Sequence, residues 1–473
     1  MRFRVSGTLI FIAASFTVTC ARASRSSTQG IPVPASALRS ELSSSGCELI
    51  SDPGERIATV ALGDRINPAN APSPANESER LLFRQVYETL FRLDCHGKLQ
   101  SGLASSWKLD TSGHSWLVTL REDAEFTDNT PLEAADVVSS WTIANTGELR
   151  PEVRSLVEAV IAVDKRTLLI TLKNHRMDEP TALAHTDLAI AKRIPGQSWP
   201  IGTRGTRVAI NGETSPSNES MVTLIQTNNS VSTRFVIASG RDSRDLLDEG
   251  VDLLVSRDTN TLNYAATLPQ FISVPLAWNR TYVLLSPGRP RTLPPLSAEA
   301  RETLAHDAVR GEARGAMGPF WWDSPTDCLP AAQSHGPQTM GRVVFDAADS
   351  VARDLADRLV GLASASGPGT TAILDALLPD RSPRTYQRAA GLPSDALKMS
   401  LRRGDEGSYV LAIDSRSLEP CRDLQALVYA AGWLDPETIV PLVNTRMKAI
   451  LRRGRSGMIE EWDGGFLLVD RGK

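Results

Sequence analysis

Two patterns of apolar residues stand out in the first third of the chain, one typical of a strand and one typical of a helix. Residues 56–62 form a short apolar run that is typical of a buried strand. Apolar side chains then recur at helical spacing, which predicts an amphipathic helix capped by Asn76 or Ser78. The apolar face of this helix is expected to consist of Leu82, Phe83, Val86, Tyr87 and Leu90.

A strand and a second helix are predicted next. The strand is expected to be buried on one side, because apolar residues alternate with more polar ones at Trp116, Val118 and Leu120. Thr130 is expected to cap the following helix, with Pro131 at the first helical position and Glu133 three residues on. This helix would carry Val137, Val138 and Trp141.

The second half of the chain continues with strands and helices. Residues 343–345 read as a strand, and residues 409–413 read as another. An amphipathic helix is predicted after the first of them, from the spacing of Val351, Leu355, Leu359 and Leu362. A chain of 473 residues is too long for one compact core, so we expect two or three lobes.

The composition is that of an ordinary soluble globular protein. Hydrophobic residues make up 41% and charged residues 22% of the chain, which excludes a disordered or membrane-spanning protein. The net charge of -4 provides no overall attraction to nucleic acid or to anionic lipid.

The first twenty residues are predicted to be an export signal. Arg2 and Arg4 precede an apolar run over residues 7–18, which is too short to span a bilayer as a mature helix. Two processing sites remain open. Cleavage after Ala23 fits the pattern of an ordinary signal peptidase site, whereas Cys20 fits the lipidated first residue of a lipoprotein, with residues 21–46 as a flexible tether.

The cysteines fit an oxidising compartment. Without Cys20 the chain keeps an even set of four: Cys47, Cys95, Cys328 and Cys421. Pairing of the first two and of the last two would keep each disulfide within one half of the chain. A single disulfide with two buried thiols is the alternative. No two cysteines have Cys-x-x-Cys spacing, which argues against a zinc or thioredoxin-like site.

Motifs of catalysis are missing from the sequence. The six histidines include no pair at the i, i+4 spacing of a metal site, and there is no Gly-x-Ser-x-Gly elbow, Walker loop or dinucleotide fingerprint. We therefore expect no enzymatic activity, no cofactor and no bound metal.

Residues 83–141 contain a series of short motifs in a fixed order. The series runs through Tyr-Glu-Thr-Leu at 87–90, an Asp-x-x-Gly turn at 94–97, Leu-Ala-Ser-Ser-Trp at 103–107, Phe-Thr-Asp at 126–128 and Thr-Pro-Leu-Glu-Ala-Ala-Asp-Val-Val at 130–138. In order and spacing it resembles the N-terminal signature of the extracellular solute-binding proteins of family 5, the oligopeptide, dipeptide and nickel receptors of ABC importers. The resemblance weakens towards the C-terminus.

The resemblance implies a periplasmic-binding-protein-like α/β fold of type II, cluster C, with two main lobes, a small extra lobe and a cleft between lobes. The first lobe would be discontinuous, formed by residues 47–87, 156–273 and 436–473. The small lobe would comprise residues 88–155, and the third lobe residues 274–435.

The resemblance also implies a function. We expect an exported receptor, in the periplasm or cell envelope, that captures a small ligand, a peptide above all, and delivers it to an ABC permease with its ATPase. The protein is expected to be a monomer without a nucleic-acid partner, and lipidated Cys20 would attach it to the membrane. The alternative is a degenerate receptor-fold protein with an interaction or regulatory role and no transport.

Departures from the family pattern concern the ligand. Asn129 replaces a glycine of the signature, and asparagine tolerates a left-handed turn. Peptide receptors of the family often place an aspartate after a strand of the third lobe to bind the ligand's α-amine. Asp414, Arg416 and Glu419 are the candidates for that position here. An acid would keep amine recognition, whereas Arg416 would favour a carboxylate or phosphate.

Four further residues are candidate ligand contacts. Asn76 and Glu77 fall in a loop that edges the cleft in the family, but they also suit a solvated helix N-terminus. Trp321 and Trp322 form an aromatic cluster with Phe320, which could line a pocket or belong to the core. Asp414 and Arg416 could equally form a local salt bridge.

Overall fold

The computed structural model describes most of the chain after the predicted export signal. The described residues are 46–173, 179–209, 221–228, 231–238, 240–287, 296–309, 312–315, 318–323, 341–364, 386–404 and 407–469. The proposed lipidation site Cys20, the tether up to residue 45 and Cys328 lie outside them. None of the helices in these ranges has both the length and the apolar character needed to cross a membrane.

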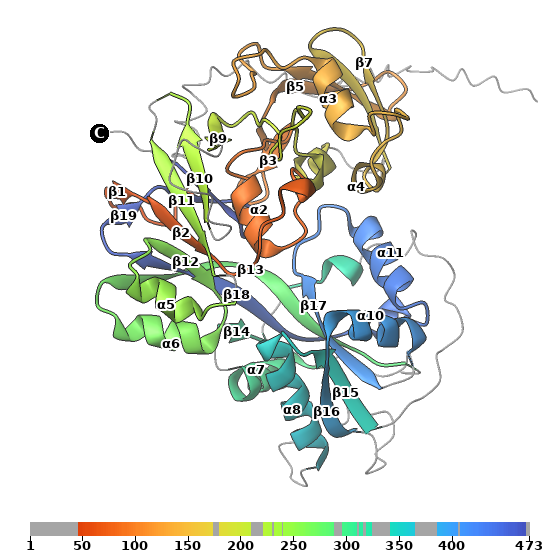
Figure 1. Ribbon diagram of the computed structural model, residues 1–473. Helices are drawn as coiled ribbons and strands as arrows, with labels where there is room; N and C mark the ends of the chain where they lie inside the picture. The colour runs from red at the N-terminus through yellow and green to blue at the C-terminus, as the bar shows by residue number, and fades with distance from the viewer. Residues whose placement is uncertain are drawn as a thin grey trace, which may run out of the picture.

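One large mixed sheet of eleven strands forms the body of the molecule (Figure 1). Its strands follow the order β16 (Tyr386–Leu392), β15 (Gly341–Asp346), β17 (Ser408–Asp414), β13 (Phe271–Leu285), β18 (Val440–Arg452), β12 (Leu253–Ser256), β2 (Thr59–Leu62), β11 (Ser232–Ile237), β10 (Met221–Gln226) and β9 (Thr206–Val208), and β14 (Ala313–Arg314) pairs with β18.

The two longest strands, β13 and β18, join the two halves of this sheet. They pair antiparallel from Phe271 opposite Arg452 to Leu284 opposite Val440. One end of β18 pairs with β12 and so with the first-lobe strands, while the other end of β13 pairs with β17 and so with the third-lobe strands. Register shifts lie between these two ends, and such bulges bend and twist a strand.

Helices cover both faces of each half, as expected for a sheet whose strands are apolar on both sides. In the first half, α2 (Glu77–Phe83) packs on the face that presents Val60, while α5 (Ser243–Asp248) and α6 (Thr259–Thr267) pack on the face that presents Ala61. In the second half, α7 (Ala298–Ala308) and α8 (Ser350–Ser364) cover one face, and α10 (Ser394–Arg403) and α11 (Pro420–Ala430) cover the other.

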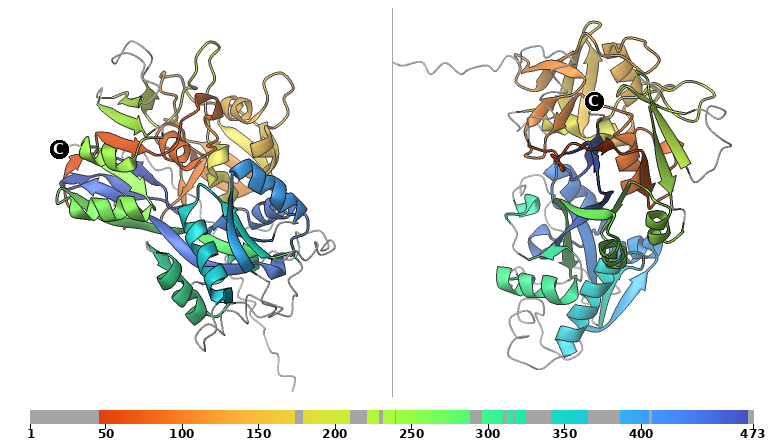
Figure 2. Two further views of the ribbon diagram at one scale, coloured as in Figure 1. Left: turned by 60° about the horizontal axis from the view of Figure 1, so that its bottom comes forward. Right: turned by 90° about the vertical axis from the view of Figure 1, so that its left-hand side faces the viewer.

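A separate four-stranded antiparallel sheet forms the small lobe, at the top of Figure 1 and at one end of the molecule in both views of Figure 2. Its strands follow the order β5 (Ala104–Leu109), β6 (Ser115–Leu120), β8 (Thr167–Leu172) and β7 (Val157–Ala162), and its helices are α3 (Ala134–Trp141) and α4 (Pro151–Arg154). We predicted that this lobe ends at residue 155, whereas two of the four strands lie beyond that boundary.

Short strand pairs and 3-10 turns connect these parts. The pairs are β1 (Glu55–Arg56) with β19 (Arg455–Ser456), β3 (Phe91–Leu93) with β4 (Leu99–Ser101), and β20 (Met458–Glu460) with β21 (Phe466–Leu468). The 3-10 segments are η1 (Pro68–Asn70), η2 (Thr181–Ala184), η3 (Thr186–Leu188), η4 (Trp321–Asp323) and η6 (Pro436–Thr438).

Helix α2 is shorter than the apolar spacing predicted. It ends at Phe83, and the later members of the predicted face are buried without being helical. The backbone carbonyls that a longer helix would use have other partners: Arg204 N–H donates to the Val86 carbonyl at 3.2 Å, and Ile190 N–H donates to the Glu88 carbonyl at 2.8 Å. Tertiary pairing therefore ends the helix early.

Helix α3 starts later than predicted. Its N-cap is Glu133, not Thr130, because the Asp136 carboxylate accepts the Glu133 N–H at 2.8 Å and completes a capping box. Thr130 instead donates its hydroxyl to Asp128 at 2.5 Å. Asn129 lies between them at φ 62°, the left-handed conformation that was expected from its place in the signature.

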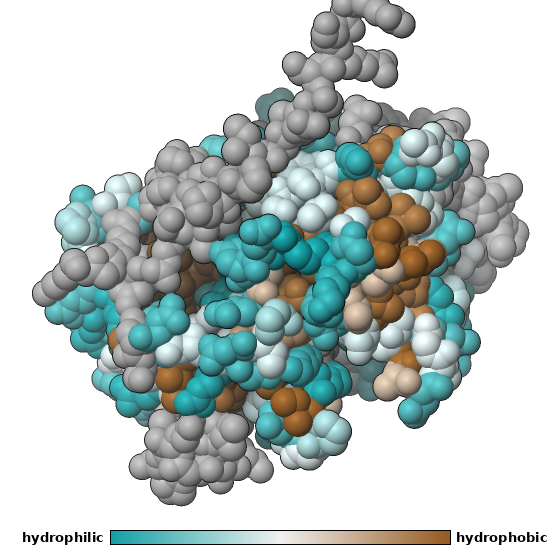
Figure 3. Space-filling model, turned by 90° about the horizontal axis from the view of Figure 1, so that it is seen from above, coloured by the Kyte–Doolittle hydropathy of each residue, from teal (hydrophilic) through white to brown (hydrophobic). Residues whose placement is uncertain are grey.

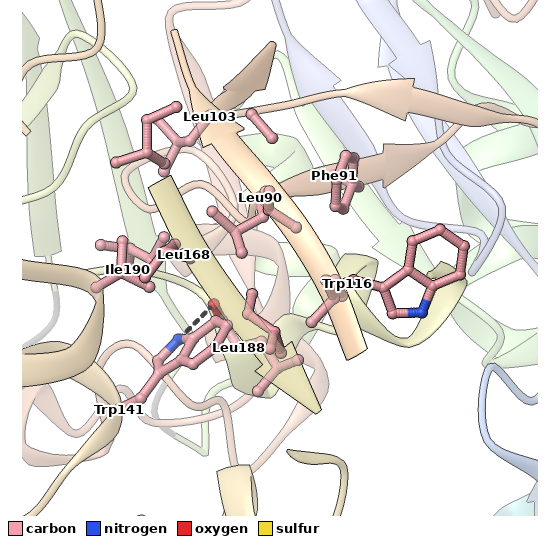
Figure 4. Close-up of a cluster of buried hydrophobic side chains, with 14 of the residues drawn as sticks. Leu90, Phe91, Leu103, Trp116, Trp141, Leu168, Leu188 and Ile190 are labelled. Atoms are coloured by element: carbon pink, nitrogen blue, oxygen red, sulfur yellow. Dashed lines mark hydrogen bonds between the residues drawn. The ribbon is translucent and has the colours of Figure 1, made fainter. Parts of the chain in front are cut away.

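The core of the small lobe is built around Trp141, which is completely buried (Figure 4). Its indole N–H donates to the Leu188 carbonyl at 3.1 Å, so that α3 is tied to the segment leading out of the lobe. The predicted strand at β6 is confirmed, since Trp116, Val118 and Leu120 are all buried. Other members of this core in Figure 4 are Leu90, Phe91, Leu103, Leu168 and Ile190.

The surface of the small lobe includes apolar side chains. Figure 3 looks down on the molecule from that end and shows apolar surface to one side of a hydrophilic area. The exposed large apolar side chains of this lobe are Leu109, Ile143, Ile161 and Val163.

A disulfide joins Cys47 to Cys95, one of the pairings left open by the sequence. It links the start of the described chain to the turn between β3 and β4, and the two cysteines are separated by 48 residues. Cys421 is disulfide-bonded as well. Because Cys328 lies outside the described residues, its pairing with Cys421 stays a prediction.

Replacing both Cys47 and Cys95 by serine should lower the free energy of unfolding by about 4 kcal/mol, because the reduced chain gains the entropy of an open 48-residue loop. Chemical denaturation followed by circular dichroism measures the change. Dithiothreitol should then destabilise the wild-type protein more than the double variant. Equal stability of the two proteins without reductant would show that this disulfide contributes nothing.

Trp141→Phe should lower the free energy of unfolding by about 2 kcal/mol, because it removes the hydrogen bond to Leu188 and leaves a cavity in the small-lobe core. Tyr429→Leu is the matched control, since Tyr429 is 82% exposed and its loss should change stability by less than about 0.5 kcal/mol. If both variants unfold at the wild-type denaturant midpoint, the role given to Trp141 is wrong.

Candidate functional site

A cleft of about 550 Å³ lies where the three parts of the molecule meet. Its walls come from α2 and the loop before it, from residues 184–189 below the small lobe, from the end of β17 with α11, and from the turn at residues 461–463. Six arginines and five acidic residues line it: Arg80, Arg84, Arg92, Arg204, Arg416, Arg422, Asp187, Asp414, Asp423, Glu461 and Asp463.

A buried carboxylate shapes the loop that forms one edge of the cleft. Glu79 on α2 is 1% exposed and accepts hydrogen bonds from the backbone N–H groups of Asn67 and Ala75, both at 2.8 Å. The side-chain amide of Asn70 donates to the same carboxylate at 2.9 Å. These bonds fold the loop back on the helix, so that Pro72 and Pro74 face the cleft.

Asn76 and Glu77 do not line this cleft. Asn76 is the N-cap of α2, and its side-chain oxygen accepts the Glu79 N–H at 2.8 Å. Glu77 accepts a hydrogen bond from Arg280 at 3.1 Å and borders a smaller adjoining cavity of about 120 Å³. Their geometry fits the helix-capping interpretation, and as ligand contacts they stay untested.

Arg84 fixes the C-terminal turn beside α2. Its two terminal nitrogens donate to Glu461 and to Asp463, and only 6% of its side chain is exposed. Burial alone would raise the pKa of the Asp463 carboxyl, but the Arg84 guanidinium lowers it to about 2. A Cβ at Gly465 would lie 2.3 Å from the guanidinium carbon of Arg84, so this position requires glycine.

Arg416 is held against the same turn. It donates to the carbonyl oxygen of Trp462, and its guanidinium lies over the Trp462 ring at 4.1 Å from the ring centroid. The stacking and the hydrogen bond occupy much of the Arg416 guanidinium, which the sequence suggested as a binding group for a ligand carboxylate.

An ionic contact bridges the cleft between the third lobe and the segment below the small lobe. Arg422 on α11 lies 3.4 Å from the Asp187 carboxylate and 2.8 Å from Nε2 of His185. Burial and the charge of Arg422 lower the pKa of His185 to about 3, so the imidazole is neutral, and its Nδ1 accepts the backbone N–H of Asp187 at 3.1 Å. Asp423 pairs with the same arginine at 2.8 Å.

Asp414 faces the cleft at the end of β17. Its carboxylate makes no hydrogen bond or ion pair to any residue of the described ranges, although its backbone carbonyl accepts the indole N–H of Trp321 at 2.7 Å. Burial raises the pKa of its carboxyl group, and Arg80 acts in the opposite direction.

Two cleft arginines, Arg80 on α2 and Arg204 in the loop before β9, differ from the other four. In the part of the chain that the structure describes, neither guanidinium has a hydrogen bond or an ion pair, and Nε of each is buried without a partner. Arg80 and Asp414 influence each other's pKa across the cleft without forming a salt bridge.

The aromatic cluster is divided between cleft and core. Trp321 lines the cleft, whereas Trp322 is 5% exposed and stacks on Phe320 with ring centroids 4.5 Å apart. The structure thus brings Trp321, Asp414 and Arg416 together at one site and leaves Trp322 in the core.

Sequence reasoning missed the charged residues on the opposite walls of the cleft. Arg80 and Arg84 lie at helical spacing after a predicted N-cap, which is a signal that α2 presents cations on one side. Nothing local marks Arg204, His185 or Arg422, because they are far apart in the chain and meet only through the fold.

Sequence comparison links the central part of the chain to a known family. Residues 98–223 match the family model described as bacterial extracellular solute-binding proteins, family 5 Middle. The chain is 27% identical over 131 residues to a putative binding protein of Haemophilus influenzae, covering 24% of this chain and 25% of that protein.

Two further relatives have more specific names. The nickel-binding periplasmic protein of Escherichia coli is 28% identical over 119 residues, which cover 24% of this chain and 22% of that protein. The periplasmic oligopeptide-binding protein OppA of Haemophilus influenzae is 39% identical over 57 residues, which cover 12% and 10%. The chain thus matches about a quarter or less of the length of these relatives.

Solved structures share the fold over nearly the whole chain. The substrate-binding protein CtaP of an ABC transporter from Listeria monocytogenes has a TM-score of 0.59 at 13% identity, with 89% of this chain and 100% of that chain covered. The unliganded open form of the murein tripeptide-binding protein MppA has a TM-score of 0.55 at 14% identity, covering 88% and 99%.

These findings agree with the signature in residues 83–141 and with the expected α/β fold. All the relatives and structures named above are binding proteins. Residues 98–223 thus resemble family 5 of the bacterial extracellular solute-binding proteins, and the chain as a whole shares the fold of the binding proteins named above.

Proposed function

We propose that this protein is a receptor that captures a peptide in the cleft and delivers it to an ABC import permease. The observation that carries the proposal is the free carboxylate of Asp414, which faces the cleft opposite the unpaired guanidinium of Arg80. A peptide offers an ammonium group for the first and a carboxylate or carbonyl for the second. The cleft volume of about 550 Å³ has room for a short peptide.

The proposed mechanism needs no chemical change in the ligand. The cleft walls come from parts of the fold that are joined through the strands β13 and β18, and relative motion of these parts would admit and enclose the ligand. Enclosure removes water from the ligand and strengthens each hydrogen bond to it. Closure is favoured only if the ligand binds the closed state more tightly than the open one.

A nickel complex is the other ligand suggested by a relative, and the described residues favour it less. Among the described residues, His185 is the histidine that lines the cleft; its Nδ1 accepts the Asp187 N–H, and its Nε2 lies 2.8 Å from the Arg422 guanidinium. Among the described residues, the one cluster with metal-ligand geometry is Cys47, Cys95 and His96, and its two cysteines are joined in the disulfide.

Export, lipidation of Cys20 and the monomeric state belong to the same proposal. Residues 1–20 would direct the chain out of the cytoplasm, and the stretch 21–46 would tether the lobes to the membrane if Cys20 is lipidated. Mass spectrometry of the protein isolated from its native membrane fraction would detect the acyl chains.

Short peptides should stabilise the purified protein against heat, by about 2.7 kcal/mol when the free peptide is at a hundred times its Kd. Differential scanning fluorimetry with a library of di- to pentapeptides measures this. Asp414→Asn should reduce the stabilisation strongly, because it removes the acceptor of the peptide ammonium. If no peptide shifts the melting temperature, the alternative of an interaction or regulatory protein without transport is favoured.

Peptide affinity should fall as the pH is lowered from neutral into the acidic range. The pKa of Asp414 is raised above its ordinary value in the free protein, so that acid neutralises the group that would bind the ammonium. Binding should release protons there, because the ammonium favours the ionised form. Calorimetric titrations between pH 4 and pH 8 would measure both effects, and Asp414→Asn should flatten the profile.

A further inference from the structure

The charged side chains of the cleft fall into two groups: those paired with another group of the protein and those without such a partner in the described residues. Arg84 is paired with two acids, and Arg92 approaches the second oxygen of Glu461 at 3.7 Å. Arg422 is paired with Asp187 and Asp423, and Arg416 is held by the carbonyl and ring of Trp462. Four of the six arginines are therefore engaged within the protein.

The acids of the cleft are engaged in the same way, with one exception. Glu461 pairs with Arg84 and Arg92, and Asp463 pairs with Arg84. Asp187 and Asp423 both pair with Arg422. Within the described ranges, Asp414 is the acid of the cleft without a side-chain partner.

Three charged groups of the cleft, two positive and one negative, have no side-chain partner in the part of the chain that the structure describes. They are carried by Arg80, Arg204 and Asp414, which come from α2, from the loop before β9 and from the end of β17. Asp414 is exposed to the cleft and Arg80 and Arg204 are half-buried, so each is accessible to a ligand of opposite charge, which would gain charge-assisted hydrogen bonds there.

Arg204 lies in a region of the cleft that already carries positive charge. Burial lowers the pKa of Arg92, and repulsion from the positive charge of Arg204 lowers it further. Glu461 is shared between Arg92 and Arg84. A second anionic group from the ligand would relieve this repulsion, and the planar guanidinium of Arg204 suits a carboxylate.

We propose that the ligand carries one ammonium group and two carboxylates, and so is an acidic peptide with one Asp or Glu side chain. This rests on the proposed function of the cleft and specifies its ligand class. The ammonium binds Asp414, and the two carboxylates, one terminal and one from the side chain, bind Arg80 and Arg204. Glutamine in place of glutamate would leave one arginine unpaired.

The test compares three peptides with free termini on the full-length mature protein. Ala-Glu-Ala should bind about ten- to a hundredfold more tightly than Ala-Gln-Ala, as expected for loss of one charge-assisted pair, and Ala-Lys-Ala should bind most weakly. Isothermal titration calorimetry gives the dissociation constants. The pentapeptides with the same central residues repeat the comparison at greater length.

Variants assign the carboxylates. Arg80→Met and Arg204→Met each remove one of the two arginines. The variant that lacks the arginine bound to the side-chain carboxylate should lose the preference for Glu over Gln. The other variant should keep this preference but bind all the peptides more weakly. Arg402→Met is the matched control, because Arg402 is exposed on α10 and does not line the cleft. It should bind all the peptides as the wild type does.

The outcomes separate this inference from the proposed function. Equal affinity for the three peptides, or tighter binding of the neutral or basic one, would overturn the acidic preference and leave a peptide receptor. A preference for Glu that survives in both arginine variants would overturn the assignment of Arg80 and Arg204. Binding of no peptide at all would overturn the proposed function and the inference with it.

Discussion

The two ion pairs of Arg84 hold the cleft together. This one side chain, just past the end of α2, reaches Glu461 and Asp463 on the turn between β20 and β21. The turn then presents Trp462 to Arg416 from the third lobe. Because a buried guanidinium loses its hydration, the arrangement is stable only while both acids are in place. The absence of a side chain at Gly465 makes room for it.

If the cleft binds a ligand as proposed, its selectivity would come from which charged groups on its walls are paired within the protein and which are not. Most charged groups on the cleft walls pair with one another and so hold the walls in place. Arg80, Arg204 and Asp414 have no side-chain partner in the described residues and are left for a ligand. The contact from Arg422 to His185 and Asp187 crosses the cleft, so it links the third lobe to the segment below the small lobe. A ligand that enters the cleft must either break such contacts or fit beside them. In both cases a ligand with complementary charges would bind more tightly.

The sequence predicted much of the fold because local patterns and tertiary packing agree there. Alternation at β6, the apolar spacing of α8 and the left-handed turn at Asn129 all appear as expected. The prediction was wrong at the end of α2 and at the start of α3. In both places a tertiary or side-chain hydrogen bond, from Arg204 to Val86 and from Glu133 to Asp136, outweighed the local signal.

The candidate site was less predictable than the fold. Asp414 could be named, together with Arg416 and Glu419, because it follows a recognisable strand near the position where peptide receptors of the family often place an aspartate. Arg80 and Arg204 could not, because charge satisfaction depends on which neighbours the fold supplies. The same limit applies to Trp321 and Trp322, adjacent in the chain, of which one lines the cleft and the other is buried in the core.

The position of β18 affects how the chain assembles. This strand comes from the last part of the sequence, yet it lies at the centre of the large sheet and pairs with β12, β13 and β14. The strands β1 and β19 pair although Glu55 and its partner Arg455 are 400 residues apart in the chain. Contacts this distant in sequence make folding slow, and neither half of the sheet is complete until synthesis is almost finished.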